Sequence, residues 1–592
     1  MKQRHEIEDK YKWDLSVLYK NSDEYKKAFE EIKALGTKIL DFKGRLNTKE
    51  NILSEFILST KMSRILERME VYLSLRKETN GADKEVLEEL AELENYLTDF
   101  AAESAFVTPE LAKLDDAFID EMIASKEFED YDIELKDLKE EKKHILDETR
   151  EKMLAKIGSF AGFSEIFSKI DDIEIKFDKI VLEDGSEVEI TNENYGLFTH
   201  DRSQRVRRDA FLALHRGFKG LNLTISENFL NFLKYCDTMA EFRNYNGTFE
   251  KRMQSSKIDK SVVFELIRHV NEHLPSFFAY AKALKKCLGL ETMYNIDVYA
   301  PVTTDKNQRL YEFDEGAEIV KQALAPMGQE YIAILNKLLQ SRTIDVYPTE
   351  NKGGGGFSCG CYDTLPFILL NYNGTHSDVS TLAHELGHSM HTYFSQNAQC
   401  YEKSGYDIFV AEIASTVNEI LLFKYMEQHA KSNAERKSYI ANFLSTFYAT
   451  VMRQTMFSEF ELFVHESTRK RVPLTYDKLN TEYGKLQKKY FGDDIVMLEN
   501  ADVEWSRIPH FYRPFYVYKY ATGFVSACSI VSNIMEKGED YVKNYYMKFL
   551  SAGGSLDPVD ILALADVDIT SAETYNKAFG LYDHYIEEFD RL

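Results

Sequence analysis

Residues 381–391 read Thr-Leu-Ala-His-Glu-Leu-Gly-His-Ser-Met-His, and this stretch carries the strongest chemical signal in the chain. His384 and His388 are four positions apart, close to one 3.6-residue turn, so on a helix both rings point the same way and can bind one metal ion. Glu385 lies about 100° around that helix, where it can hold a water molecule at the metal and not the metal itself. This pattern is typical of zinc peptidases.

The residues around the pattern predict a buried amphipathic helix. Ser377 and Asp378 precede it and are predicted to cap its N-terminus. The alternative is an ordinary helix whose histidines make only hydrogen bonds. Chance placement of 14 His and 98 Asp and Glu residues gives at most about 0.06 such motifs in 592 residues. The metal interpretation is also favoured by apolar residues at helical spacing: Val379, Leu382, Ala383, Leu386 and Met390.

A catalytic zinc ion usually has three protein ligands and one open position, so a third ligand must come from elsewhere in the chain. We expect this ligand to be Glu412, which lies in a second helical and otherwise apolar stretch. The spacer after His388 is long enough for the first helix to end, a loop through Gly405 to form, and the second helix to pack beside the first.

Glu419 and His391 each lie on the same helix face as one of the expected metal ligands. Glu419 is seven residues after Glu412, and it could hydrogen-bond a ligand histidine from outside the metal shell; a solvated surface glutamate is the alternative. His391 is seven residues after His384 and shares its face of the helix. If His391 were the third ligand, the three ligands would span about 10 Å along one straight helix. One zinc ion, with bonds of about 2 Å, does not easily reach both ends of that span. We therefore expect His391 to support the site or to pack near it.

A glycine-rich segment, residues 352–370, reads KGGGGFSCGCYDTLPFILL. Its second part, from residue 357, is rich in aromatic and β-favouring residues and predicts a strand. A glycine strand that faces a cleft lets a peptide backbone approach and add as a further strand; a flexible surface loop is the alternative. The residues predicted to contact substrate are Gly355, Gly356 and Phe357.

A second aromatic-rich segment covers residues 508–523. Core packing is the simplest explanation for Phe511, Phe515 and Tyr518. Tyrosine hydroxyls and a histidine in this segment can instead donate hydrogen bonds to an oxygen that gains charge as water attacks a carbonyl. The prolines and the glycine in the segment favour a shaped loop.

Taken together, these segments resemble oligoendopeptidase F, the bacterial branch of the thimet oligopeptidase family. The resemblance is carried by residues 384–391, 409–416, 352–370 and 508–523, with a similar start at residues 11–15, Tyr-Lys-Trp-Asp-Leu. It covers nearly the whole chain. It implies a mainly α, two-lobed metallopeptidase of the cytoplasm, with a small β-sheet next to the HExxH helix. A deep channel would admit short peptides and exclude folded proteins.

The resemblance also implies one zinc ion per chain, bound by His384, His388 and Glu412, with Glu385 as the general base. Cobalt and manganese are compatible with the same ligand set.

His510 and a nearby tyrosine match the family's pair that binds substrate and stabilises the oxyanion. We favour Tyr512 and Tyr516 as substrate-binding residues and Tyr516 as the catalytic one, while Tyr518 and Tyr520 remain open alternatives.

Composition narrows the class of protein. A net charge of −25 disfavours binding to nucleic acid and to anionic membranes. The N-terminus is charged, and no run of 18 apolar residues occurs, so we expect a cytoplasmic protein without a signal peptide or membrane span. Six scattered cysteines favour free thiols. Cys359 and Cys361 depart from the small polar residues expected in the glycine-rich segment, and they could make activity sensitive to oxidation.

Helical patterns dominate the chain, and strand signals are few. Residues 173–190 predict a hairpin that turns at Asp184-Gly185, and residues 343–370 form the second β region. We predict an N-terminal helical domain over residues 1–200 and a catalytic domain over residues 201–592.

The leading functional hypothesis is an endopeptidase of short peptides. A carboxypeptidase-like enzyme would need a cation for the substrate's terminal carboxylate, and Arg513 and Lys519 are candidates. A catalytically silent, peptide-binding scaffold is the third hypothesis. The cleavage preference and the oligomeric state do not follow from the sequence.

Overall fold

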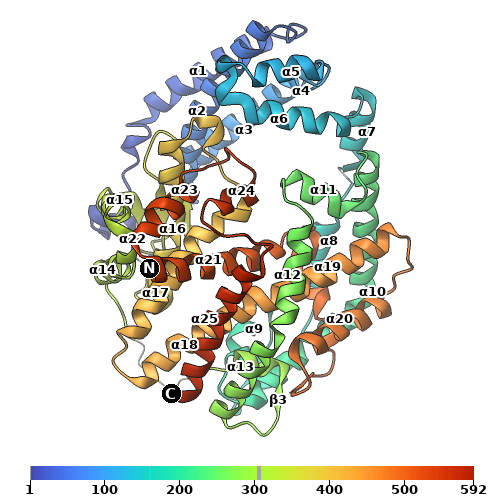
Figure 1. Cartoon of the computed structure of the whole chain (residues 1–592), viewed down its shortest axis with the longest axis vertical. Helices are drawn as coiled ribbons and strands as arrows, with labels where there is room; N and C mark the ends of the chain where they lie inside the picture. The colour runs from blue at the N-terminus through green and yellow to red at the C-terminus, as the bar shows by residue number, and fades with distance from the viewer. Residues whose placement is uncertain (1, 159, 303–308) are drawn as a thin grey trace. The chain divides into compact units, whose positions relative to one another are not determined.

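The computed structural model describes residues 2–158, 160–302 and 309–592, and within them the chain is mainly α-helical (Figure 1). Contacts divide the chain into two compact units. Unit 1 comprises residues 1–145, 307–422 and 533–566, and unit 2 comprises residues 146–306, 423–532 and 567–592. The sequence-based division at residue 200 stays a prediction, because these units are defined by contacts and not by function.

Unit 1 contains a small sheet among helices from all three of its stretches. Its strands are β4 (Ile344–Asp345), β5 (Phe357–Cys359) and β6 (Phe367–Leu369). Its helices are α1 (Ser22–Leu40), α2 (Lys49–Thr79), α3 (Lys84–Ser104), α4 (Val107–Leu111), α5 (Asp116–Ile123), α6 (Asp132–Glu141), α14 (Phe313–Ala323), α15 (Gly328–Gln340), α16 (His376–Ala398), α22 (Glu539–Tyr541), α23 (Met547–Leu550) and α24 (Pro558–Ala563).

Unit 2 is also mainly helical. Its strands are β1 (Lys179–Val181), β2 (Glu187–Glu189), β3 (Met293–Tyr294) and β7 (Ile495–Val496). Its helices are α7 (Glu148–Gly158), α8 (Phe163–Lys169), α9 (Asn192–Thr199), α10 (Gln204–Phe242), α11 (Thr248–Ser255), α12 (Ser261–Glu272), α13 (Leu274–Leu288), α18 (Asn433–Phe447), α19 (Arg453–Arg469), α20 (Tyr476–Phe491) and α25 (Ala572–Arg591). Two helices belong to both units, α17 (Ile408–Gln428) and α21 (Tyr518–Lys537).

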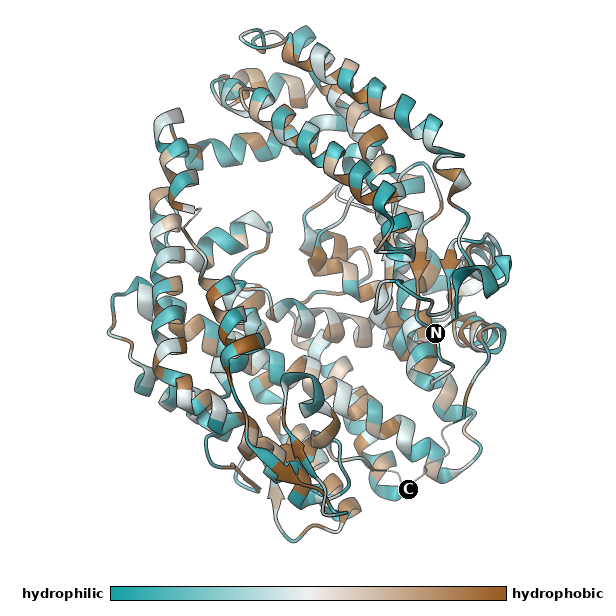
Figure 2. Ribbon diagram, turned by 180° about the vertical axis from the view of Figure 1, so that it is seen from behind, coloured by the Kyte–Doolittle hydropathy of each residue, from teal (hydrophilic) through white to brown (hydrophobic). Residues whose placement is uncertain are grey.

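The helices begin where the sequence supplies caps. Asn21 accepts a hydrogen bond from Glu24 N at the start of α1, and Thr48 and Ser203 act in the same way for α2 and α10. Figure 2 shows teal and brown residues mixed along most helices. This mixture is expected of amphipathic helices that bury one face and expose the other.

Both predicted β regions contain strands, but the hairpin is shorter than predicted: residues 173 and 174 end a helical turn, and pairing begins at Lys179. β1 and β2 pair antiparallel, and the hairpin turns through Gly185, whose φ of +82° is easy only for glycine. In unit 1 the strand order is β4-β6-β5, with β4 parallel and β5 antiparallel to β6. Strand β5, which follows the glycines, is therefore an edge strand of its sheet.

The small sheet of unit 1 is fixed from two sides. Phe367, Leu369 and Cys361 share one hydrophobic core with residues of α1, α2 and α3, and the Trp13 ring lies edge-on to Phe367 at 6.4 Å between centroids. Helix α16 packs against β5 and β6, and the Ser358 and Ser389 hydroxyls lie 2.8 Å apart. The predicted sheet beside the HExxH helix is thus confirmed.

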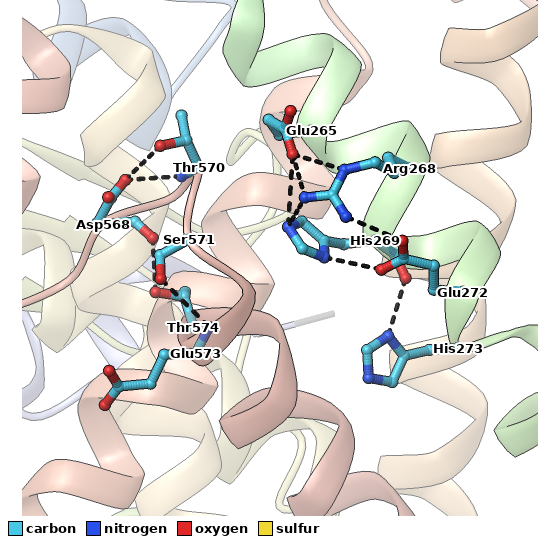
Figure 3. A network of polar contacts seen from close by, with 10 residues as sticks. All are labelled: Glu265, Arg268, His269, Glu272, His273, Asp568, Thr570, Ser571, Glu573 and Thr574. Atoms are coloured by element: carbon cyan, nitrogen blue, oxygen red, sulfur yellow. Dashed lines mark hydrogen bonds and ion pairs between the residues drawn. The ribbon is translucent and has the colours of Figure 1, made fainter.

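In unit 2, a second pair of histidines at helical spacing, His269 and His273, lies in a network of polar contacts (Figure 3). On α12, His269 Nδ1 lies 3.2 Å from a Glu272 carboxylate oxygen, and Arg268 bridges to Glu265 and Glu272. The rings of His269 and His273 stack on Tyr575 and Phe579 of α25 at 4.5 and 4.3 Å. These contacts hold α12 on α25.

Across residues 2–158, 160–302 and 309–592, no helix is both long and apolar enough to span a membrane.

Candidate metal centre

The N-cap of helix α16 lies two residues before Ser377, the first of the predicted caps. Thr375 is the N-cap, and Asp378 lies at the third helical position, where its carboxylate accepts the Thr375 N–H at 2.8 Å. The prediction of Ser377 and Asp378 as caps is therefore wrong. The reciprocal bonds of Thr375 and Asp378 satisfy two helix-end donors at once, which a cap at Ser377 would not do. The buried face is confirmed, since all five predicted apolar residues are fully buried: Val379, Leu382, Ala383, Leu386 and Met390.

The structure brings His384, His388 and Glu412 together. The two Nε2 atoms lie 3.1 Å apart, and Glu412 Oε2 lies 3.5 Å from each of them. In the described part of the chain, these three residues form the one group whose ligand atoms lie within 4.8 Å of one another. Two imidazole nitrogens and one carboxylate oxygen suit zinc, and the short separations fit one ion bound by three side chains.

Glu419 orients the first histidine. Its carboxylate hydrogen-bonds His384 Nδ1, so the ring proton sits on that nitrogen and Nε2 is free to face Glu412 and His388. Burial lowers the pKa of His384, but the hydrogen bond and the negative charge of Glu419 outweigh it and raise this pKa. The His388 hydrogen bond lowers the pKa of Glu412, which keeps this carboxylate ionised.

The close approach of α17 to α16 depends on Gly387. A methyl group added to Gly387 would lie 2.5 Å from Ser415 Cα and 2.7 Å from the Ala414 carbonyl oxygen. Asn418 Nδ2 also donates to the Ala383 carbonyl at 3.0 Å, directly before the first histidine. The glycine between the two histidines therefore sets how near Glu412 comes to them.

We expect Gly387→Ala to weaken zinc binding at least about tenfold, because α17 must move to relieve the backbone clash and its carboxylate moves with it. Zinc titration against a competing chelator measures this change. Gly220→Ala in α10 is the matched control, since a methyl group there has no atom within 4 Å. Equal zinc affinity in both variants would contradict this role of Gly387.

Glu385 lies beside the glycine segment. It is only 6% exposed, and burial raises the pKa of its carboxyl group. A methyl group built on Gly356 would lie 3.7 Å from Glu385 Oε1 and 3.1 Å from Thr381 Cγ2. The backbone before β5 thus runs close to this carboxylate, and a side chain at Gly356 would crowd the space.

The glycine segment is anchored on both sides. Asn371 Nδ2 donates to the carbonyls of Gly353 and Gly355 at 2.8 and 2.9 Å, and Gly353 N–H donates to the Glu78 carbonyl at 2.8 Å. The Lys352 ammonium is fully buried and pairs with Asp345 at 2.8 Å. These bonds count against the alternative of a freely flexible loop. The run of glycines did not predict them, because Asn371 and Glu78 lie far from the glycines in sequence.

His391 lies outside the ligand group. Its ring is fully buried and stacks on Tyr406 at 3.8 Å and near Phe549 at 5.2 Å, and neither ring nitrogen has a hydrogen-bond partner among the described residues. Burial lowers its pKa to about 3, so the ring is neutral.

The two cysteines of the glycine-rich segment lie in an environment that suppresses thiol reactivity. Burial raises the pKa of Cys359 to about 11 and that of Cys361 to about 12, with a smaller contribution from Glu67. We expect both thiols to resist iodoacetamide at neutral pH in the native protein and to react once it is unfolded, because the thiolate is the reactive form. Peptide mapping by mass spectrometry tests this expectation. Rapid native labelling with loss of activity would support oxidation sensitivity instead.

The aromatic segment lies in unit 2, where three residues form a cluster. His510 lies 6.3 Å from Tyr516 and 6.0 Å from Tyr520 between ring centroids, and the two tyrosines are 5.4 Å apart. All three are partly exposed. Burial, with Arg513 and Arg453 nearby, lowers the pKa of His510 and favours its neutral form. Tyr520, an open alternative in the sequence analysis, thus lies in the same cluster as the favoured Tyr516.

The other residues of the segment belong to the interior of unit 2. Phe511, Phe515 and Tyr518 are buried, as predicted. Tyr512 is also buried: its hydroxyl accepts a hydrogen bond from Asn228 Nδ2 at 3.0 Å, and its ring stacks on Phe167. Of the two favoured tyrosines, Tyr512 is therefore buried and Tyr516 is partly exposed.

A mainly helical chain that presents HExxH on one helix and a glutamate beside it on the next has the fold and the site of a metallopeptidase. Residues 197–581 match the pattern of peptidase family M3, and residues 110–177 match that of oligopeptidase F. The chain belongs to peptidase family M3, in its oligoendopeptidase F branch.

Named relatives agree with this assignment. The chain is 32% identical to the oligopeptidase PepF of Bacillus subtilis, over 100% of this chain and 88% of the relative. It is 35% identical to an oligoendopeptidase F homolog of Borreliella burgdorferi, over 100% and 99%. Among solved structures, a putative peptidase from Chlamydophila abortus matches with a TM-score of 0.94 at 31% identity, over 100% and 99%. Oligoendopeptidase-F from Enterococcus faecium matches with a TM-score of 0.72 at 27% identity, over 96% and 99%.

Proposed function

We propose that this peptidase is a zinc-dependent endopeptidase that hydrolyses internal bonds of short peptides in the cytoplasm and excludes folded proteins. The observation that carries the proposal is the convergence of His384, His388 and Glu412, with Glu385 next to it on the same helix. The family assignment supports peptide hydrolysis, and the names of the relatives support oligopeptides as substrates.

The ligand set is the common one for a hydrolytic zinc ion. When bound, zinc would polarise the scissile carbonyl and lower the pKa of the attacking water. His384 and His388 would supply neutral nitrogens, and Glu412 the one negative charge. Glu419 would keep His384 in the correct tautomer.

Glu385 is the proposed general base. Its carboxylate would take a proton from the attacking water and later pass it to the leaving amine. Burial raises its pKa, which makes it a stronger base than an exposed glutamate. In the described residues it is outside the ligand group, so its oxygens remain available for proton transfer.

The partly exposed cluster of His510 and Tyr516 is proposed to stabilise the oxyanion. A neutral histidine and a tyrosine hydroxyl can each donate one hydrogen bond to an oxygen that gains negative charge. The lowered pKa of His510 supports the neutral form that this role requires. Tyr520 lies in the same cluster and is the alternative donor.

Substrate would bind along the edge of β5. Backbone hydrogen bonds to this edge would hold a peptide with little regard to its side chains. Gly355 and Gly356 precede the strand, and no atom lies within 4 Å of a methyl group built on Gly355, so a peptide backbone has room to approach there.

A carboxypeptidase-like activity is the second candidate. The Arg513 guanidinium is exposed and lies over the Tyr516 ring at 4.5 Å, where it could meet a terminal carboxylate. Lys519 is less suited, since its ammonium donates to the Ser256 hydroxyl at 3.3 Å.

The test uses internally quenched peptides and purified protein. We expect zinc-dependent cleavage at an internal bond, lost with chelator and restored by zinc. Amidation of the C-terminus should leave the rate unchanged for an endopeptidase and abolish cleavage by a carboxypeptidase. A folded domain with the same cleavable sequence in a structured helix should resist. No turnover of any peptide by the zinc-loaded protein would contradict the proposal.

A further inference from the structure

A buried carboxyl group lies directly beneath the aromatic segment of unit 2. Glu461 is on α19, is 1% exposed, and accepts the backbone N–H of Phe515 through Oε1 at 2.7 Å. Its other oxygen is buried and has no hydrogen-bond partner among the described residues. Arg252 is the cation that acts on this carboxyl group electrostatically, and burial still raises the pKa of Glu461 to about 8.

The residue held by this bond has an unfavourable backbone conformation. Phe515 has a φ of +55°, in the left-handed region that a bulky aromatic residue rarely adopts. Such a conformation is strained for a residue with a side chain and persists only where the surroundings enforce it. The Phe515 ring contacts the rings of Phe249 and His465, at centroid distances of 4.6 and 4.9 Å. Glu461 holds the backbone and these two rings hold the side chain.

Stability alone does not account for a carboxyl group at this position. A buried polar group with an unpaired oxygen destabilises the fold relative to an apolar side chain of similar volume. His465, one turn further along α19, is also buried and has no hydrogen-bond partner for either ring nitrogen among the described residues. What Glu461 supplies, and a methionine could not, is an acceptor for the Phe515 N–H.

The constrained turn leads straight into the proposed oxyanion residues. Tyr516 follows Phe515, and its ring faces His510 and Tyr520. Pro514 precedes the turn and has no N–H of its own to anchor it. The direction in which Tyr516 leaves the backbone therefore depends on the conformation of one residue, and that conformation depends on Glu461.

We propose that Glu461 is a positioning residue, which holds the turn at Phe515 and thereby places the Tyr516 hydroxyl beside His510 for oxyanion stabilisation. The proposal rests on the function proposed above. It assigns to a buried helix residue a role in transition-state geometry, without contact with substrate.

The test compares two substitutions of one residue. Glu461→Met fills the volume but removes the acceptor, whereas Glu461→Gln keeps an acceptor oxygen. We expect Glu461→Met to lower kcat about 10- to 100-fold with KM within about twofold of wild type, because a misplaced oxyanion donor affects the transition state and not ground-state binding. Glu461→Gln should keep most of the activity. Zinc content should not change in either variant.

The matched control is Asn295→Leu. Asn295 is also buried in unit 2 and accepts a loop N–H, that of Leu498 at 3.1 Å. This variant should lose stability while kcat per folded molecule is retained. Amide hydrogen exchange gives a readout without turnover: peptides covering residues 511–520 should exchange faster in Glu461→Met and at the wild-type rate in Asn295→Leu.

A double-mutant cycle separates positioning from general damage. If Glu461 acts through Tyr516, Tyr516→Phe should cost much less in the Glu461→Met background than in wild type. Additive losses, or a Glu461→Met variant with wild-type kcat and wild-type exchange, would overturn the proposal. Wild-type activity of both Tyr516→Phe and His510→Ala would instead overturn the proposed role of the aromatic segment, so the two failures are distinguishable.

Discussion

Glu385→Gln is expected to abolish nearly all peptide turnover while zinc content and folding remain at wild-type levels. The amide has the shape of the carboxylate but cannot accept a proton from water, and loss of a general base costs about 10²- to 10⁴-fold in rate. The side chain lies outside the ligand group of His384, His388 and Glu412, so metal binding should persist. Hydrolysis of a quenched peptide, metal analysis and thermal unfolding measure the three quantities.

The control for this variant makes the same change at a carboxyl group of similar burial. Glu55 on α2 is 3% exposed, burial raises its pKa, and it accepts a hydrogen bond from the Ser59 hydroxyl. Glu55→Gln should leave kcat unchanged. Turnover near the wild-type rate in Glu385→Gln would refute its assignment as the base. Loss of zinc in that variant would mean that Glu385 supports the ligands.

His388→Ala is expected to lose both zinc and activity. The ring nitrogen that would be removed lies 3.1 Å from His384 Nε2 and 3.5 Å from Glu412 Oε2, at the centre of the ligand group. Losing a partner outside the metal shell typically costs about 10- to 100-fold in metal affinity, and losing a ligand should cost more. Metal analysis after gel filtration, with zinc added back up to millimolar concentration, tests the claim.

His391→Phe is the matched control, because it alters a buried histidine on the same helix one turn away. Phenylalanine can keep the stacking on Tyr406, and neither ring nitrogen of His391 has a partner to lose among the described residues. Zinc should be retained in this variant. Full zinc occupancy in His388→Ala would exclude His388 as a ligand, and zinc loss in both variants would point to damage of α16 instead.

Local patterns predicted the parts of this protein that depend on one segment at a time. The spacing of His384 and His388 requires only a helical turn, and the buried face of α16 requires only apolar residues at that spacing. The hairpin at Gly185 followed from a turn signal between two short strands. In each case the interactions that decide the structure lie within about ten residues.

Contacts between distant segments were not predictable in this way. Asn371 and Glu78 anchor the glycine segment from 18 and 275 positions away from Gly353, by subtraction of their residue numbers. Tyr512 and Tyr516 look equivalent in sequence, but one is packed on Phe167 and the other is partly exposed. Each of the two units is assembled from three separate stretches of chain. The sequence contains no linker-like segment that would have predicted the boundaries between these stretches.

The sequence by itself determined the chemistry: a helix with two histidines and a glutamate, a glutamate further along as the third candidate ligand, and the family that these motifs resemble. Only the tertiary structure decided how near these groups come. Gly387 permits the close contact of α17 with α16, and Glu461 holds Phe515 in a left-handed conformation. The physical reason is that residue types and short spacings specify local geometry, whereas the approach of two helices or the anchoring of a turn depends on side chains from remote positions packing without clashes.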